Sequence, residues 1–338
     1  MKCYVIPSPK GIDSLTLVER PDPAPGPRQV LVRVRATSLN YRDLITVEGN
    51  YARAAPKPDL IPLSDGAGEV VSVGPGVTRV KVGDRVAGCF MQRWVGGAID
   101  DAAFGSAMGG AIDGMLTELA VLEEDGVVRL PQGLSFEEGA TLACAAVTAW
   151  HALVEIGGIK AGDTVLVLGS GGVSIFALQF ARMVGARVLA TSSSKAKAER
   201  LKAMGADAVV DYRATPDWDQ EITKLTGGRG VDITVEVGGA GTLPRSLMAT
   251  RIAGRIAVIG LLTGPGAQID PMPILRRNLR VQGLYVGNRQ MFEAMNRAIA
   301  AGGLKPVIDK VFPFAEAKDA YRHLKSENHF GKVVISHG

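Results

Sequence analysis

Apolar and polar positions follow two different patterns along this chain. From Met1 to about Val128 the period is two, as in QVLVRVRATSLN (29–40), where apolar and charged residues alternate. Clusters of glycine and proline such as PDPAPGPR (21–28) interrupt the alternation at short intervals. Short strands with regular Gly/Pro punctuation are typical of antiparallel sheets that close on themselves. The first part of the chain is therefore predicted to be a mainly antiparallel, barrel-like domain.

The later part of the chain alternates strands with helices. It opens with a buried strand over 164–168, a glycine-rich turn over 169–174 and a helix over 175–183. A second helix is predicted over 196–204. Further strands are predicted over 187–191, 208–212, 231–239, 254–262 and 279–286. Such alternation is typical of an α/β fold with a doubly wound parallel sheet.

Between these parts the sequence changes character over 130–155: a helix is predicted to start after Ser135, and 140–155 should be its buried part. Ser135 is its expected N-cap and Glu138 would complete a capping box. The small residues of this stretch would suit close packing between two domains. The segment 91–115 is rich in Gly and Ala, and it is expected to be either a surface lobe or lid, or an irregular loop.

The C-terminal part should add two helices, over 289–302 and 314–326, and a strand over 331–335 that returns to the first domain. With 338 residues the chain exceeds what one hydrophobic core usually serves. We predict one domain from 1–145 with 287–338, and a second from 146–286.

Composition narrows the classes of function. The net charge of +4 is mild and its basic residues are scattered, so no nucleic-acid surface is expected. Residues 164–181 carry no charge, but a glycine break at their centre argues against a membrane span. Three widely spaced cysteines favour a reducing compartment, and Pro7 interrupts any early apolar run. A cytoplasmic location is expected.

The turn after the first α/β strand carries the clearest chemistry. Glycine lets a backbone turn sharply and approach a pyrophosphate, and the helix that follows offers free N–H groups and its positive dipole end. The third glycine of the Gly-x-Gly-x-x-Gly pattern is replaced by a small serine, which close packing tolerates. The predicted cofactor-binding residues of this turn are Gly169, Gly171, Gly172, Val173 and Ser174.

Cofactor choice is expected to depend on the end of the second α/β strand. NAD-binding units carry Asp or Glu there, to hydrogen-bond the ribose 2′-OH. This chain has Ser192, Ser193, Ser194 and Lys197 instead, and hydroxyl and ammonium groups would bind a 2′-phosphate. NADP(H) is therefore the predicted cofactor. Alternatively, the serines only cap the next helix and the lysines face water. With a weaker basis, Tyr212 is placed beside the adenine.

Several segments together resemble the medium-chain dehydrogenase/reductase superfamily, and most of all its quinone oxidoreductase branch. They are SLNYRDL (38–44), DGAGEVVSVGPGVTRVKVGDRV (65–86), CAAVTAW (144–150), GSGGVS (169–174), VEVGG (235–239) and HFGKVVI (329–335). The resemblance covers nearly the whole chain. It implies a GroES-like catalytic domain with a Rossmann domain, Thr148 near the nicotinamide ribose, and a homodimer formed through the strand near 279–286.

The resemblance also raises the question of zinc. Alcohol dehydrogenases of the superfamily hold a catalytic zinc with Cys, His and Cys. These positions correspond here to Asn40, Ser64 and Cys144, and a neighbouring second-shell glutamate corresponds to Asp65. Neither a carboxamide nor a neutral hydroxyl is a good zinc ligand. The four cysteines of a structural zinc lobe are also missing, because 89–115 contains only Cys89. No metal is expected.

Without a Lewis acid, oxidation of an unactivated alcohol is difficult. A quinone, or an alkene conjugated to a carbonyl, spreads the arriving charge onto its own oxygen and needs only positioning and a proton or hydrogen bond. By resemblance, Asn40 lines the nicotinamide pocket, and Tyr51 is the candidate proton donor. The alternative for Tyr51 is packing on the barrel rim, and Arg42 and Asp43 are expected to form a structural ion pair.

The sequence thus predicts an NADPH-dependent, zinc-independent reductase of quinones or α,β-unsaturated carbonyls. Two alternatives remain open. One is an alcohol dehydrogenase with an atypical metal site built from Cys144, Asp65 and Asn40. The other is a protein that binds NADPH for a structural or regulatory purpose without significant turnover.

Overall fold

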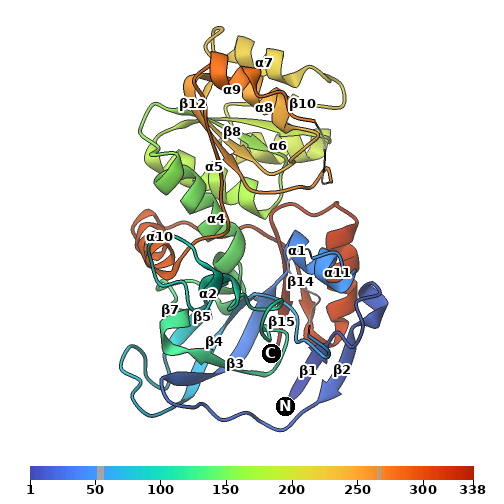
Figure 1. Cartoon of the computed structure of the whole chain (residues 1–338), viewed down its shortest axis with the longest axis vertical. Coiled ribbons are helices and arrows are strands. Elements are labelled where there is room, and N and C mark those ends of the chain that lie inside the picture. The colour runs from blue at the N-terminus through green and yellow to red at the C-terminus, as the bar shows by residue number, and fades with distance from the viewer. Residues whose placement is uncertain (52–56, 265, 267) are drawn as a thin grey trace. The chain divides into compact units, whose positions relative to one another are not determined.

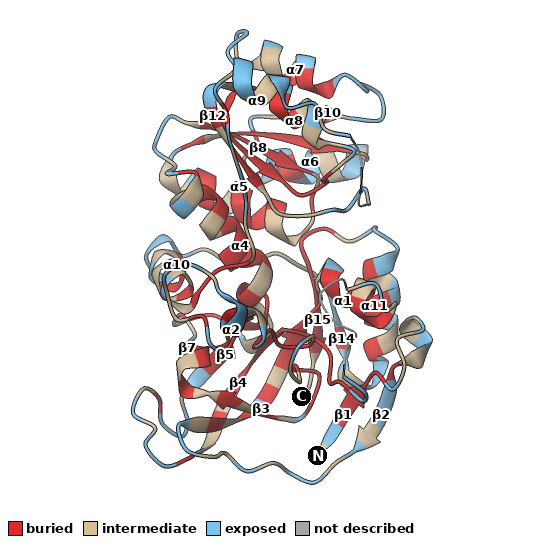
Figure 2. Ribbon diagram, in the orientation of Figure 1, coloured by how far each residue is buried: buried red, intermediate tan, exposed pale blue. Residues whose placement is uncertain are grey.

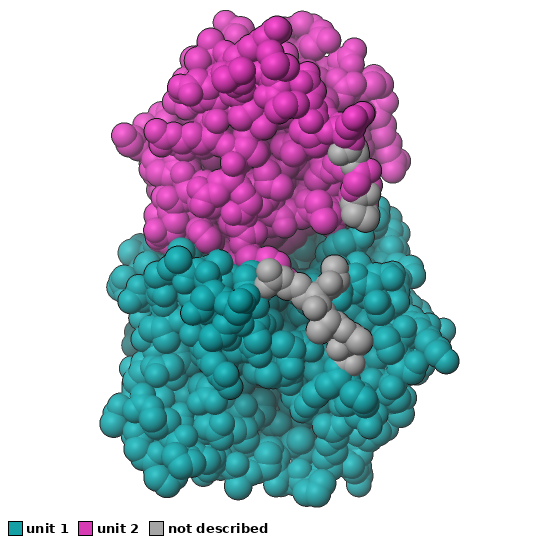
Figure 3. Space-filling view, in the orientation of Figure 1, with its two compact units in different colours: residues 1–147, 287–338 teal, residues 148–286 magenta. Residues whose placement is uncertain are grey.

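The protein divides into two compact units. In a computed structural model that describes every residue except 52–56, 265 and 267, the first unit contains 1–147 and 287–338. The second contains 148–286 (Figure 3). The first boundary thus follows Val147, slightly later than the sequence suggested.

The first unit contains a seven-stranded, mostly antiparallel sheet (Figure 1). Its order is β14-β15-β3-β4-β5-β7, and β6 also pairs with β3. The strands are β3 (Gln29–Ser38), β4 (Asp65–Val73), β5 (Arg85–Gly88), β6 (Leu119–Glu123), β7 (Val127–Arg129), β14 (Ile308–Pro313) and β15 (Lys332–Ser336). Of the described strands of this sheet, β14 and β15 pair in parallel and the others pair antiparallel, and β1 (Lys2–Val5) and β2 (Thr16–Glu19) form a separate hairpin. This GroES-like arrangement, with the returning C-terminal strand, is the predicted one.

Strand β3 shows why the period-two pattern folds in this way. Val30, Val32 and Val34 lie on its buried side, together with Val70 of β4 and other members of one apolar core. Arg33, between them, is exposed. Because successive side chains point to opposite faces of a strand, a one-residue shift would expose all of these valines. The register therefore follows from the sequence pattern.

Part of the segment 91–115 contributes to the core of the first unit. Met91, Trp94, Met108 and Met115 are all buried, and the two latter residues belong to the same apolar core as β3. The segment contains one short helix, α2 (Asp101–Phe104). These buried side chains explain how a charge-poor, irregular segment is held in place, whereas its middle, over 97–102, is exposed or half-buried.

Helices of the first unit flank the sheet (Figure 1). They include α1 (Tyr41–Val47), α10 (Arg289–Gly302) and α11 (Ala317–Lys325). Helix α3 (Phe136–Ala140) begins at the predicted capping box: Ser135 accepts from the Glu138 N–H at 3.1 Å, and the Ser135 N–H donates to Glu138 at 2.8 Å. The turn after it, η3 (Leu142–Ala146), is π-helical, as is η4 (His151–Ile156) beyond α4 (Val147–Trp150). The sequence pattern did not predict these π-helical turns.

The second unit is built on a six-stranded, fully parallel sheet. Its order is β10-β9-β8-β11-β12-β13, the order of a Rossmann-type doubly wound fold. The strands are β8 (Thr164–Leu168), β9 (Arg187–Ser192), β10 (Ala208–Asp211), β11 (Val231–Glu236), β12 (Thr250–Val258) and β13 (Arg280–Gly283). Strands β8 and β11 are buried along their whole length (Figure 2). Continuous burial explains their apolar, rather than alternating, sequences.

The helices of this unit are α5 (Gly172–Val184), α6 (Lys195–Ala203), α7 (Trp218–Leu225), α8 (Leu243–Ala249) and α9 (Met272–Arg276). The strands and the two helices predicted for this unit are observed, but several ends differ, and α7, α8 and α9 were not predicted. Strand β12 begins at Thr250 and ends at Val258, earlier than predicted at both ends, and β11 ends at Glu236. Across the described parts of the chain, no helix combines the length and apolar character needed to cross a membrane.

Candidate functional site

The glycine turn of the second unit has the geometry expected of a dinucleotide site. Gly169 has φ +72°, in the left-handed region that favours glycine. Gly171 is the N-cap of α5, with φ −74°, so its backbone conformation does not require glycine. Ser174 is buried, and its hydroxyl donates to the Leu168 carbonyl at 2.6 Å, tying the helix to the preceding strand. The serine therefore takes over the packing role of the missing glycine.

The space around Gly171 fits a phosphate group. A Cβ placed on this residue would meet no atom within 4 Å, so packing within the protein does not exclude a side chain there. The first N–H groups of a helix also have no partner inside that helix, and the dipole favours an anion. These features fit the pyrophosphate of a nicotinamide dinucleotide, with Gly172 and Val173 in the first turn of α5.

The polar residues at the end of β9 differ in role: two serines stabilise the local backbone, and Ser193 and Lys197 remain candidates for binding a ligand. Ser194 is the N-cap of α6 and accepts from the Lys197 N–H, at 3.5 Å. Ser192 is buried, and its hydroxyl donates to the Ser194 carbonyl at 3.1 Å. The capping alternative therefore describes Ser194, while Ser192 supports the turn. The half-buried Ser193 and the Lys197 side chain are the remaining candidates for a 2′-phosphate contact.

Two other predicted cofactor residues differ in exposure. The Tyr212 side chain is 41% exposed just beyond β10, so its ring is available for stacking. Thr148, in α4, is buried. Both lie in the second unit, as do the glycine turn and the serine cluster. All predicted cofactor-binding residues thus belong to a single unit.

The first unit contains a buried polar cluster around Lys332. This lysine is only 3% exposed on β15, and its Nζ donates to the Asn40 Oδ1 and to the Leu39 carbonyl, each at 2.6 Å. The Asp65 Oδ2 lies 3.8 Å from the same Nζ. Ser64 in turn donates to the Asp65 Oδ1 at 2.8 Å. The cluster therefore joins Asn40, Ser64 and Asp65 through one ammonium group.

These contacts do not suit a zinc ion. The Asn40 oxygen already accepts from Lys332, and the ammonium would repel a divalent cation placed against Asn40 and Asp65. Cys144 is half-buried. Its burial and the nearby Asp65 carboxylate raise the pKa of its thiol, which therefore stays protonated, whereas zinc binds the thiolate. The part of the chain that the structure describes contains no group of three His, Cys, Asp or Glu side chains able to hold a metal. The donor set present does not fit the metal.

Arg42 and Asp43 lie at the start of α1, beside this cluster. Their closest charged atoms are 3.8 Å apart, so the predicted ion pair is present. The Arg42 guanidinium lies over the rings of Tyr51 and Phe90, at 4.7 and 4.8 Å from the ring centres, and donates to the Met108 carbonyl at 2.7 Å. Tyr51 therefore has the packing contact that the sequence left open as an alternative to proton donation.

Burial raises the pKa of Asp43 to about 6, although the Arg42 charge and the Asn40 N–H, 2.8 Å from the carboxylate, oppose this shift. Burial also raises the pKa of Asp65, and Lys332, Asn40 and Ser64 act against it. Two carboxyl groups and two cationic groups thus share one buried region. Such concentrations of perturbed groups are frequent at functional sites.

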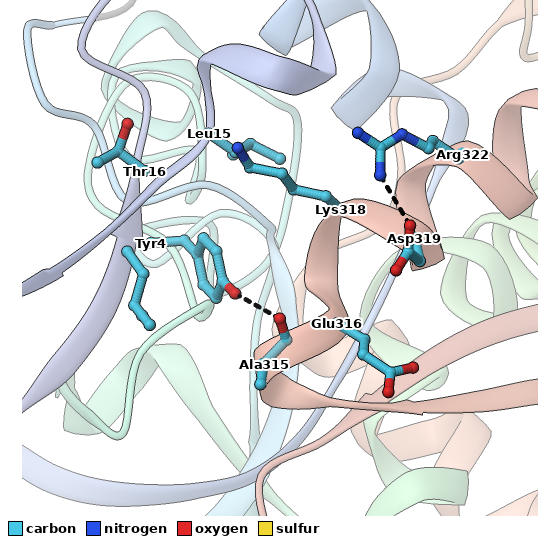
Figure 4. A pocket seen from close by; sticks show the side chains of 9 residues that line it. Tyr4, Leu15, Thr16, Ala315, Glu316, Lys318, Asp319 and Arg322 are labelled. Atoms are coloured by element: carbon cyan, nitrogen blue, oxygen red, sulfur yellow. Dashed lines mark hydrogen bonds and ion pairs between the residues drawn. The ribbon is translucent and has the colours of Figure 1, made fainter.

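Sequence reasoning missed Lys332. The local signal for it is a single charged residue in the otherwise apolar strand GKVVI. A separate surface hollow, between β2 and α11, is lined by Tyr4, Lys318, Asp319, Arg322 and their neighbours (Figure 4). It contains none of the predicted site residues, and Arg322 pairs with Asp319 at 2.7 Å.

Comparison with known proteins identifies the family. Residues 26–132 match the alcohol dehydrogenase GroES-like domain, and residues 172–301 match the zinc-binding dehydrogenase family. A zinc-type alcohol dehydrogenase-like protein of Schizosaccharomyces pombe is 44% identical over 315 residues, covering 91% of each chain. The chain belongs to the medium-chain dehydrogenase/reductase superfamily. It is therefore an NAD(P)-dependent oxidoreductase of that superfamily.

Solved structures of the superfamily share the fold. An NAD-dependent alcohol dehydrogenase is 34% identical over the whole of both chains, with a TM-score of 0.91. A mycobacterial protein complexed with NADPH is 27% identical over the whole of both chains, with a TM-score of 0.84. Relatives of this medium-chain dehydrogenase/reductase thus include both an NAD-dependent enzyme and a protein bound to NADPH.

Proposed function

We propose that this protein is an NADPH-dependent, zinc-independent reductase that transfers hydride to a quinone or to an α,β-unsaturated carbonyl compound. The observation that carries the proposal is the Lys332 ammonium between Asn40 and Asp65. The oxygen atoms of Asn40 and Asp65, which an atypical metal site would need as ligands, instead face the ammonium group of Lys332. The proposal places the protein near the quinone oxidoreductase branch of its superfamily.

The bound dinucleotide would supply the hydride. The acceptor's own conjugation would carry the arriving charge to its oxygen, so the protein must orient the acceptor and stabilise that oxygen. Asn40 is the proposed hydrogen-bond donor to the oxygen, and Tyr51 the proposed source of the proton. Neither step requires a Lewis acid.

The preference for NADPH is proposed from the end of β9. No carboxylate stands there to bind a ribose 2′-OH or to repel a 2′-phosphate, and Ser193 and Lys197 are the candidate phosphate contacts. The relatives support either nucleotide, so the preference depends on these residues. A Ser193→Asp variant should raise the KM for NADPH about tenfold or more and leave the KM for NADH nearly unchanged, because a new carboxylate repels only the phosphorylated ribose.

The decisive experiment follows loss of the nicotinamide absorbance with purified protein. NADPH and NADH are compared with a quinone, a 2-alkenal and an enoyl thioester, and metal content is measured in the same preparation. We expect turnover of at least one acceptor with NADPH, unaffected by a chelator. Equal use of NADH would contradict the cofactor proposal, and activity lost with the chelator and restored by zinc would contradict the metal-free proposal.

Zinc-dependent alcohol oxidation is the second candidate, because the S. pombe relative is named a zinc-type alcohol dehydrogenase-like protein and residues 172–301 match the zinc-binding dehydrogenase family. Stoichiometric zinc, with oxidation of a simple alcohol, would favour it. If the protein binds NADPH but oxidises it with none of the acceptors, the third alternative, a non-catalytic NADPH-binding protein, would be favoured instead.

A further inference from the structure

Lys332 fixes which way the Asn40 amide faces. An ammonium group only donates hydrogen bonds, so the atom 2.6 Å from its Nζ must be the amide oxygen. The opposite end of the carboxamide, Nδ2, must therefore point away from the lysine. This orientation follows from chemistry, whereas the two ends of an isolated carboxamide are otherwise hard to tell apart.

The Asn40 Nδ2 is a buried donor that makes no hydrogen bond within the described part of the chain. It lies beside the Asp65 carboxylate, where it opposes the rise in the pKa of that group that burial causes. A carboxamide carries two N–H bonds, so one remains available for a ligand even when the other turns toward Asp65. Buried donors without a partner are uncommon in folded proteins, and each needs an explanation.

The amide oxygen of Asn40 accepts a hydrogen bond from Lys332. Asn40 precedes α1, where an asparagine side chain often caps the helix. Here the Asp43 N–H donates to the backbone carbonyl of Asn40, at 3.0 Å, while the amide oxygen is held by Lys332. The amide oxygen is thus held from β15, while Asn40 and Asp43 form a capping box at the start of α1, in which the Asn40 N–H donates to the Asp43 carboxylate at 2.8 Å.

We propose that Lys332 is the positioning residue of the reductase site: it holds Asn40 so that Nδ2 donates to the carbonyl or quinone oxygen of the acceptor. This inference rests on the function proposed above. A cation at the oxygen end polarises the amide and makes its N–H a stronger donor. A buried ammonium also costs several kcal/mol of desolvation unless it is compensated, so a lysine here is a poor choice for stability alone.

The surrounding charges are consistent with this role. Lys332 and Arg42 face Asp43 and Asp65 in the same buried region, so the ionised cluster has no net charge. Lys332 therefore needs no external anion to remain buried. Its direct contacts are uncharged oxygens of Leu39 and Asn40, and the carboxylate of Asp65 is farther away, at 3.8 Å.

The first test measures positioning without turnover. Side-chain amide NMR of the full-length protein, with Asn40 assigned by comparison with Asn40→Asp, reports how strongly the carboxamide is restrained. We expect a restrained amide in the wild type and a mobile one in Lys332→Met. Lys310→Met is the matched control, because Lys310 is exposed on β14, the strand paired with β15. Equal restraint in Lys332→Met and the wild type would overturn the proposal.

The second test measures coupling in catalysis. Loss of one oxyanion donor typically lowers kcat by 10²- to 10³-fold, so we expect about a 100-fold loss in Asn40→Ala and about a tenfold loss in Lys332→Met. The double variant should be no slower than Asn40→Ala, because Lys332 acts through that side chain. The KM for NADPH should not change. Multiplicative losses in the double variant would overturn the proposal.

Two further variants separate folding from function. Lys332→Arg retains the charge and donors and should recover part of the activity lost in Lys332→Met. Asn40→Asp retains an oxygen for Lys332 but removes the N–H donor, so its kcat should fall as in Asn40→Ala. Full activity in Asn40→Asp would overturn the proposal even if Lys332→Met does not fold.

The two tests also distinguish this inference from the proposed function. If the wild type turns over no quinone or enone, the proposed function fails and so does the assignment of an acceptor oxygen to Nδ2. The NMR comparison would then still show whether Lys332 orients the amide. If turnover is found but Lys332→Met retains full kcat, only the role of Lys332 fails.

Discussion

At the scale of single residues, the chemistry of the first unit depends on groups that are both buried and charged. Asp43 is 1% exposed and Lys332 3% exposed, yet each makes polar contacts. For Asp43 these contacts do not fully offset burial, and its pKa is raised to about 6. A carboxyl group of this kind makes stability depend on pH near neutrality.

The first prediction concerns Asp43→Asn. Because the folded protein binds the Asp43 proton more tightly than the unfolded chain, this carboxyl group stabilises the fold at low pH, and the stabilisation is lost as pH rises through about 6. Asparagine does not titrate. The free energy of unfolding of the wild type relative to Asp43→Asn should therefore be about 1 kcal/mol higher at pH 5 than at pH 7.5. Urea unfolding at both pH values measures this, and a constant difference would contradict the raised pKa.

The second prediction separates the two roles of Tyr51. In the wild type the Arg42 guanidinium lies 4.7 Å from the centre of the Tyr51 ring. Phenylalanine retains this ring but has no hydroxyl. If Tyr51 donates the proton, Tyr51→Phe should lower kcat about 100-fold, with an unfolding temperature close to that of the wild type. Steady-state kinetics with the best acceptor provides the measurement. An unchanged kcat would leave Tyr51 with packing as its only role.

At the scale of elements, the β8–turn–α5 unit combines two glycines with different physical requirements. Gly169 has a left-handed backbone conformation. Gly171 has a conformation that any residue can adopt, and a Cβ added to it would meet no atom within 4 Å. The first requirement comes from the chain itself, and we propose that the second comes from a dinucleotide that approaches the helix end. Substitution should therefore affect different measurements at the two positions.

The third prediction follows from this difference. Gly169→Ala should lower the free energy of unfolding by about 1–2 kcal/mol, because a Cβ is strained at φ +72°. Gly171→Ala should leave stability nearly unchanged but weaken NADPH binding about tenfold or more. Chemical unfolding and nucleotide fluorescence titration measure the two effects. Wild-type NADPH affinity in Gly171→Ala would argue against a pyrophosphate at this helix end.

At the scale of the whole molecule, β13 is one of the two edge strands of the six-stranded sheet, and β10 is the other. Within the described residues β13 pairs with β12 alone, and Arg280, Gln282 and Gly283 are exposed. An exposed edge offers unpaired N–H and C=O groups to another chain. We therefore propose that two copies pair through this strand, as the resemblance implied.

The fourth prediction tests that dimer. The Leu284 N–H donates to Val258 of β12, so by alternation the Gly283 N–H points away from β12. A Cβ at Gly283 would meet no atom within 4 Å. Gly283→Pro should therefore preserve the fold but remove an outward donor and shift the protein from dimer to monomer. Sedimentation velocity measures this shift, with Lys310→Met as a control. A wild-type monomer would contradict the proposal directly.

The sequence by itself determined the features that depend on neighbouring residues. Alternating valines specify β3, a capping box starts α3, and the glycine turn joins β8 to α5, because each depends on local backbone and side-chain geometry. It also established that Asn40 and Ser64 are poor zinc ligands, since ligand chemistry depends on residue type. The π-helical turns after α3 were not predicted, because their apolar pattern fits an ordinary helix equally well.

Only the tertiary structure decided what the polar residues contact. Lys332 and Asn40 are separated by 292 positions, and no local pattern indicates that the lysine holds the amide. The same holds for the serines after β9: Ser194 caps α6 and Ser192 supports the turn, while their residue types alone suited phosphate binding equally well. Periodicity records which side of an element is buried, whereas a polar contact depends on which distant strand packs beside it.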